Sequence, residues 1–184
     1  MNYKFRDLRA DEIDCRPATI NEKGCVLLLY KDARVDMNIL DETVGCMNWK
    51  KEYRRDNANC ILSIYDTEKG EWVGKEDTGV ESYTEKEKGL ASDSFKRAGF
   101  CWGIGRELYT APFIWIPSVV HREDGNTEMF FQLREGKNGN KTTYDKFAVE
   151  QIIIEDKKIV ALSIRNTTLN KRVYLMDIRE DKQK

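Results

Sequence analysis

A helical segment that contains several glycines constrains the fold of this chain more than any other feature. It spans about Thr84 to Leu108 and follows an acidic strand end, Glu76-Asp77-Thr78-Gly79. Apolar and small residues recur along one helix face, at Leu90 or Ala91, Phe95, Ala98 and Trp102. Each glycine inside a helix costs about 1 kcal/mol relative to alanine. We therefore expect this helix to pack on a sheet, with another backbone close to its glycines at 99, 103 and 105.

Three alternating segments ahead of this helix predict the strands of an antiparallel meander. They span residues 48–55, 58–65 and 71–78. Turn-forming residues separate them at Arg55-Asp56-Asn57 and from Asp66 to Gly70. The strands are short and follow one another closely, so we expect them to form one sheet on which the long helix packs.

The segments on either side carry further elements. Residues 18–30 predict a hairpin, and a short helix follows between the N-cap Asp32 and Gly45. The C-terminal part predicts strands at about 128–133, 147–154, 159–164 and 172–178. We expect an α+β fold: a three-stranded antiparallel meander packed on a long helix, with an N-terminal hairpin-helix and a β-rich C-terminal part. Residues 1–118 would form the core, and residues 119–184 an extension packed on the same domain.

Composition favours a globular protein. The chain has 184 residues, of which 40% are hydrophobic, and a net charge of −1. No apolar run approaches the roughly 20 residues of a membrane span, and the N-terminal residues lack the apolar core of a signal peptide. We expect a cytoplasmic protein with no membrane contact. The five cysteines are far apart and His121 is the only histidine, so a zinc site is not expected and the cysteines predict small core residues.

Known catalytic patterns are missing from the sequence. There is no phosphate-binding loop of the G-x-x-x-x-G-K-[ST] type. Glu76 and Asp77, with Lys75 and Lys86 nearby, make the best nuclease candidate, but a third, separated carboxylate is lacking. We expect a protein that is not an enzyme and has no cofactor or metal.

Two groups of cations are candidate phosphate ligands. Lys96 and Arg97 are adjacent on the long helix and about 100° apart on its surface, although Asp93 offers either of them an ion pair. In the first meander strand, Lys51 and Arg55 share a face with two aromatic residues, while Lys50 and Arg54 lie on the other face. That strand either lines a nucleic-acid groove or turns Trp49 and Tyr53 into the core.

The order of these features resembles a known family. The quoted matches are Glu76-Asp77-Thr78-Gly79, Lys86-Glu87-Lys88, Ser92-Asp93-Ser94-Phe95-Lys96-Arg97-Ala98 and Gly103-Ile104-Gly105, with Arg34-Val35 and Gly45-Cys46-Met47-Asn48-Trp49 upstream. Together they resemble the Rad-fifty-two/Rad-twenty-two single-strand annealing proteins, especially their short phage and prophage relatives. The resemblance covers roughly residues 30–110.

This resemblance implies ATP-independent binding and annealing of complementary single-stranded DNA in homologous recombination and DNA repair. It also implies a homo-oligomeric ring or arc, with a single-strand-binding protein as a further candidate partner. By motif position, Lys96 and Arg97 would line the inner groove, with Arg34 as a helper and Lys88 and Lys69 as further DNA-binding cations. Family members often carry another arginine three residues after the Lys-Arg pair, and this chain has Phe100 there.

Other interpretations remain open from the residues alone. Arg34 is either a phosphate ligand or an ion-pair partner of Asp32 or Asp36. The chain could also be a nucleic-acid or protein-interaction module that does not anneal strands, or, less favoured, a metal-dependent nuclease.

Overall fold

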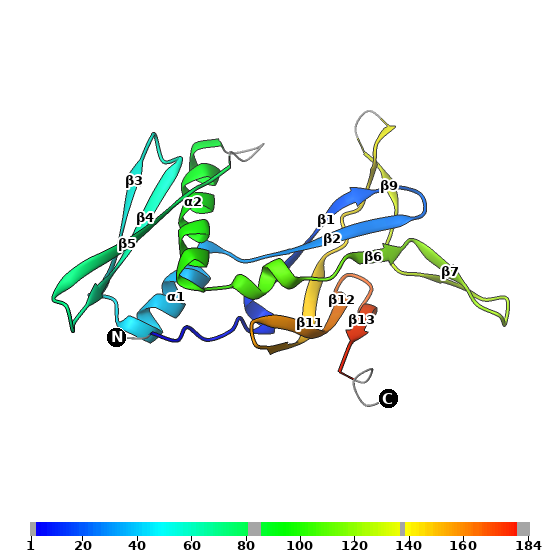
Figure 1. Ribbon diagram of the computed structural model, residues 1–184. Helices are drawn as coiled ribbons and strands as arrows, with labels where there is room; N and C mark the ends of the chain where they lie inside the picture. Colours follow the sequence, from blue (N-terminus) through cyan, green and yellow to red (C-terminus); the bar gives the residue numbers. More distant parts are fainter. Residues whose placement is uncertain (1–2, 81–85, 137–138, 180–184) are drawn as a thin grey trace. The chain divides into compact units, whose positions relative to one another are not determined.

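Two compact units make up the protein. The computed structural model describes residues 3–80, 86–136 and 139–179, with the backbone alone for residues 86–88. The first unit combines Met1–Asp7 with Asp32–Arg106, and the second combines Leu8–Lys31 with Glu107–Lys184 (Figure 1). Each unit is therefore built from segments that lie far apart in the sequence. The sequence predicted a functional core in residues 1–118 and an extension in residues 119–184. That division concerned function as well as folding, and it stays a prediction.

The first unit contains a three-stranded antiparallel sheet and two α-helices. Its strands are ordered β3 (Trp49–Arg54), β4 (Asn59–Asp66) and β5 (Glu71–Thr78). α1 spans Ala33–Val44, and Asp32 caps it by accepting a hydrogen bond from the Arg34 backbone N–H. α2 spans Lys86–Trp102 and packs on β4 and β5. The buried side chains between these elements include Leu62, Ile64, Phe95, Ala98, Ile39 and Leu40.

The long helix ends earlier than the sequence predicts. α2 stops at Trp102 rather than near Leu108, and a short 3₁₀ helix, η2 (Arg106–Thr110), follows. Gly103 has a φ of +97°, which an L side chain rarely adopts, so the chain leaves the helix there. The backbone N–H of Ile104 then bonds to the Gly99 carbonyl at 3.1 Å and closes the helix end.

The second unit is a six-stranded antiparallel sheet that curls into a nearly closed barrel. Its order is β13-β12-β11-β1-β2-β6. The strands are β1 (Asp14–Ile20), β2 (Gly24–Tyr30), β6 (Ile114–Pro117), β11 (Phe147–Glu155), β12 (Lys158–Asn166) and β13 (Lys171–Asp177). β6 and β13, at the two ends of this order, approach one another. Its core is lined by apolar side chains that include Cys25, Leu27, Ile116, Phe147, Leu162 and Ile164.

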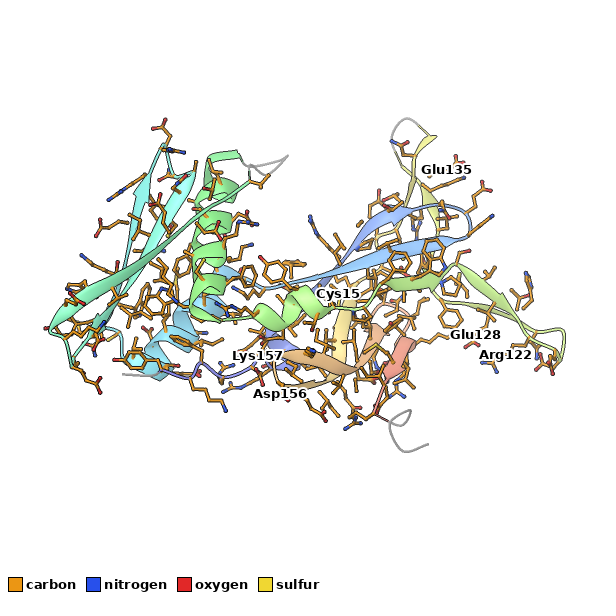
Figure 2. All side chains as sticks on the ribbon, in the orientation of Figure 1. Cys15, Arg122, Glu128, Glu135, Asp156 and Lys157 are labelled. Atoms are coloured by element: carbon orange, nitrogen blue, oxygen red, sulfur yellow. The ribbon has the colours of Figure 1, made fainter. Side chains whose placement is uncertain are left out.

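Short elements complete the second unit. They are the 3₁₀ helix η1 (Ala10–Glu12) and two hairpins, β7 (Val119–His121) with β8 (Thr127–Met129) and β9 (Arg134–Glu135) with β10 (Lys141–Thr142). Arg122 and Glu128 form an ion pair on the β7–β8 hairpin (Figure 2). Lys171 of β13 also pairs with Glu128, which ties the hairpin to the six-stranded sheet.

The fold class expected from the sequence is wrong. The structure is 45% strand and 21% helix, and its main feature is the barrel-like six-stranded sheet rather than a meander on a long helix. The prediction failed because it treated the N-terminal hairpin and the C-terminal strands as separate parts. β1 in fact pairs with β11, at Asp14 with Ala148 and at Cys15 with Phe147. A pairing between residues so far apart leaves no local pattern in the sequence.

Candidate nucleic-acid interface

The cations predicted to bind DNA all lie in the first unit. They are Arg34, Lys50, Lys51, Arg54, Arg55, Lys69, Lys88, Lys96 and Arg97. The side chain of Lys88, at the start of α2, is outside the described residues. The others occupy four places: α2 with the start of α1, the strand β3, the β3–β4 turn, and the β4–β5 hairpin.

Asp32, at the N-terminal end of α1, feels the charges of both Arg34 and Lys96. The Arg34 guanidinium donates two hydrogen bonds to the Asp32 carboxylate, from Nε to Oδ1 at 2.9 Å and from Nη2 to Oδ2 at 3.1 Å. Hydrogen bonds from the Arg34 side chain and backbone lower the pKa of Asp32, and the charge of Lys96 lowers it further. Arg34 thus forms the ion pair with Asp32, while Lys96 acts on the same carboxylate through its charge, and the Arg34 side chain stays 82% exposed.

Arg97 turns toward β5 instead. Its Nε lies 3.5 Å from Oδ1 of Asp77, an ion pair without a hydrogen bond among the described residues. The Asp77 carboxylate is already engaged, since Oδ1 accepts the Thr78 backbone N–H at 2.7 Å and Oδ2 accepts the Cys101 thiol. Asp93, the acid that the sequence offered to the Lys96-Arg97 pair, accepts the Val80 backbone N–H at 2.9 Å.

The first meander strand divides its cations between two faces. Lys51 lies on the α2 side, with Nζ 4.6 Å from the Phe95 ring centroid, and Trp49 stacks on the same ring at 6.1 Å. The aromatic residue Trp49 thus packs against α2. Lys50 faces the other way and pairs with Glu52 at 3.1 Å. Arg54 is exposed on that same outer face.

The remaining cations lie in turns. Arg55 opens the β3–β4 turn with a φ of +50°, and its side chain is exposed. This turn is attached to α2, because the Ser94 hydroxyl donates to the Asn57 carbonyl at 3.1 Å. Lys69, in the β4–β5 hairpin, lies 3.9 Å from Glu71.

Three further residues shape this region, and none of them was predicted to belong to a nucleic-acid interface. Arg106 donates from Nε to the Phe100 carbonyl at 2.7 Å and from Nη2 to the Cys101 carbonyl at 2.9 Å. Lys75 donates to the same Cys101 carbonyl at 2.9 Å. Both cations stabilise the C-terminal end of α2, where the helix dipole favours positive charge. Trp72 is the third, and its ring is 43% exposed on the outer face of the sheet.

The candidate nuclease carboxylates diverge. Neighbouring residues on a strand point to opposite faces, and Glu76 accepts a hydrogen bond from Asn59 at 2.6 Å whereas Asp77 lies near Arg97. Within the described residues, no group of three or more His, Cys, Asp or Glu side chains could hold a metal ion. In the same part of the chain, no helix is long and apolar enough to cross a membrane.

Comparison of the chain with protein-family models, with curated proteins and with solved structures finds no match. Its function is therefore argued from its own residues.

Proposed function

We propose that this chain binds single-stranded DNA through its sugar-phosphate backbone and anneals complementary strands without ATP. The observation that carries the proposal is that Arg34 and Lys96 both act on Asp32 at the start of α1, with Arg97 next to Lys96 on α2. Phe95 and Ala98 are buried in the first unit. The backbone that presents the two α2 cations is therefore held firmly, which favours a preformed phosphate site.

The acid beside Arg34 does not prevent phosphate binding. An exposed ion pair contributes only about 0–1 kcal/mol, and the Arg34 pair with Asp32 is of this kind. Each phosphate that replaces such a partner also releases counterions, so log K falls with log[salt] by about 0.7 for each phosphate contact on a single strand. Binding is accordingly expected to be tolerant of sequence and strongly dependent on salt.

Oligomerisation belongs to the same proposal. One chain with a net charge of −1 offers few phosphate contacts. A ring or arc of many copies would multiply those contacts along one strand and raise the affinity without new chemistry. A monomer at micromolar concentration in sedimentation would count against this part of the proposal.

The test is strand annealing with a double variant. We expect Lys96→Ala combined with Arg97→Ala to abolish most annealing and to reduce the salt slope of oligonucleotide binding by about 1.4, since two phosphate contacts are lost. The matched control is Lys23→Ala combined with Lys158→Ala, which removes two exposed cations from the second unit. Fluorescence annealing assays at several salt concentrations give both quantities.

The outcomes separate the candidate functions. If both double variants anneal like the parent chain, the proposed site is wrong. If the parent chain binds single strands but never anneals them, the function is that of a plain binding module.

A further inference from the structure

An aromatic and cationic cluster lies on the outer face of the β3-β4-β5 sheet. Trp72 of β5 and Tyr65 of β4 are register partners, and their ring centroids lie 5.3 Å apart at an interplanar angle of 59°. The Lys50 ammonium lies 5.1 Å from the centroid of the Trp72 ring. This cluster, the Trp72 platform, consists of Trp72, Tyr65 and Lys50.

Strand alternation places the Trp72 platform on the opposite side of the sheet from α2. Cys60, Leu62 and Ile64 of β4 are buried and point toward the helix side, whereas Ile61, Ser63 and Tyr65 alternate with them. On the helix side, Trp102 donates a hydrogen bond to the Leu62 carbonyl and Phe95 stacks on Trp49. Neither contact involves Trp72. Core packing on α2 therefore does not account for a tryptophan at this position.

The strand position beside Trp72 carries no side chain. Gly74 pairs with Ser63, and an added Cβ would lie 3.0 Å from both Ser63 Oγ and Ile61 Cγ2. Along the outer face of β5, Trp72 is thus followed by a glycine whose side is covered by Ser63 and Ile61 of β4.

The charges on this face suit a strand of nucleic acid better than an apolar partner. Lys50 stands next to Trp72, and Arg54 is exposed farther along β3. Of the two acids near the centre, Glu52 pairs with Lys50, whereas Glu76 accepts a hydrogen bond from the neutral Asn59 amide and keeps its charge. Base stacking on an exposed aromatic ring with a cation nearby is the common mode of sequence-tolerant single-strand binding.

We propose that the Trp72 platform stacks a base of single-stranded nucleic acid while Lys50 contacts the adjacent phosphate. This inference rests on the proposed function, and it adds a contact to bases that the phosphate-binding cations of α1 and α2 do not supply. It assigns two roles to two sides of the first unit: backbone binding beside α2, and base binding on the outer sheet face.

The test compares an oligothymidylate with an abasic oligonucleotide of the same length, which keeps the phosphates and lacks the bases. We expect Trp72→Ala to weaken oligothymidylate binding about tenfold and to leave abasic binding unchanged, whereas Trp72→Phe keeps a stacking ring and most of the affinity. Phe113→Ala is the control, since this aromatic residue is 74% exposed in the second unit. Circular dichroism and native mass verify folding and assembly of each variant.

Three results with Trp72→Ala would overturn the inference, and two further results separate its failure from failure of the proposed function. The platform is wrong if Trp72→Ala binds oligothymidylate like the parent chain, or if it weakens both ligands equally. It is also wrong if Trp72→Ala changes the native mass, because the face then contacts a second copy of the chain. If the parent chain binds neither oligonucleotide, the proposed function itself fails. If only the Lys96 and Arg97 variant loses binding, the proposed function survives without the platform.

Discussion

Single glycines decide how closely the elements of the first unit approach. Gly79 follows β5 where the chain runs against α2, and a Cβ there would lie 2.5 Å from the Ser94 backbone nitrogen and 2.7 Å from the Leu90 carbonyl oxygen. Both atoms belong to the helix backbone, which cannot turn aside as a side chain can. Gly99 lets α2 approach a side chain of α1, because a Cβ there would lie 2.4 Å from Oδ1 of the buried Asp36.

We predict that Gly79→Ala lowers the free energy of unfolding by about 1–3 kcal/mol, the usual cost of overpacking. Urea titration followed by circular dichroism measures it. Gly103→Ala is the comparison, because it has nothing within 4 Å and a φ of +97°, so it reports backbone strain without a clash. A Gly79→Ala variant as stable as the parent chain would contradict the close approach.

Strands of the second unit are joined by a charged cluster as well as by their backbones. Glu150 of β11 accepts from Arg165 Nε of β12 at 2.8 Å, from Arg172 Nε of β13 at 2.7 Å and from the Ser163 hydroxyl at 2.8 Å. These hydrogen bonds, from Arg165 first, lower the pKa of Glu150 from 4.5 to about 2. One carboxylate thus connects three neighbouring strands.

A folded-state pKa below the unfolded value means that the charged carboxylate stabilises the fold. That contribution is fully present above pH 4.5 and is lost as the pH falls through about 2. We predict that Glu150→Gln is less stable than the parent chain at pH 7 and that the difference shrinks between pH 4.5 and 2. Urea titrations across this range measure it, with Glu155→Gln, an exposed position at the end of β11, as the control. A stability difference that is independent of pH would refute the role of the charge.

At the scale of the whole molecule, the two units alternate along the chain, and the Asp32–Arg106 segment of the first unit is inserted between the two segments of the second. β1 and β2 come from residues before the insertion, and β6, β11, β12 and β13 come from residues after it. Completion of the six-stranded sheet therefore requires both ends of the described chain. The segment expected to bind DNA and the segment that builds the barrel are interleaved in sequence.

We predict that a fragment of residues 1–118 keeps the meander but loses the protection of β1 and β2, because β11, β12 and β13 are removed. Hydrogen exchange of the fragment and the full chain, monitored by mass spectrometry, would show fast exchange at residues 14–30 and slow exchange at residues 59–66 in the fragment. Equal protection of β1 and β2 in both would show that the N-terminal hairpin folds without its C-terminal partners.

Much of the local structure follows from the sequence. Alternation and turn residues predicted strands at 48–55, 58–65 and 71–78, and the structure has β3, β4 and β5 within a residue of those bounds. The strands expected at 147–154, 159–164 and 172–178 appear as β11, β12 and β13, within two residues of the expected bounds. The N-cap at Asp32 is confirmed as well. Each of these features depends on residues a few positions apart, so a single sequence displays them.

The sequence predicted only part of the candidate site. Lys96 and Arg97 stood out as an adjacent pair, but their acid neighbours, Asp32 and Asp77, lie on other elements. The sequence showed only that Trp72 lies in an alternating strand. That pattern does not say which face of the sheet its side chain lies on. The face of a strand is decided by what packs on the sheet, and here that is α2.

By itself, the sequence determined where strands, turns and helix caps form, because periodicity and turn chemistry act over short distances. Only the tertiary structure decided that β1 pairs with β11, which carboxylate each cation meets, and which side of the β3-β4-β5 sheet exposes Trp72. Those outcomes depend on the burial of apolar surface between segments that are distant in the chain. The free energy of this burial is a sum over the whole fold, so no single segment determines it.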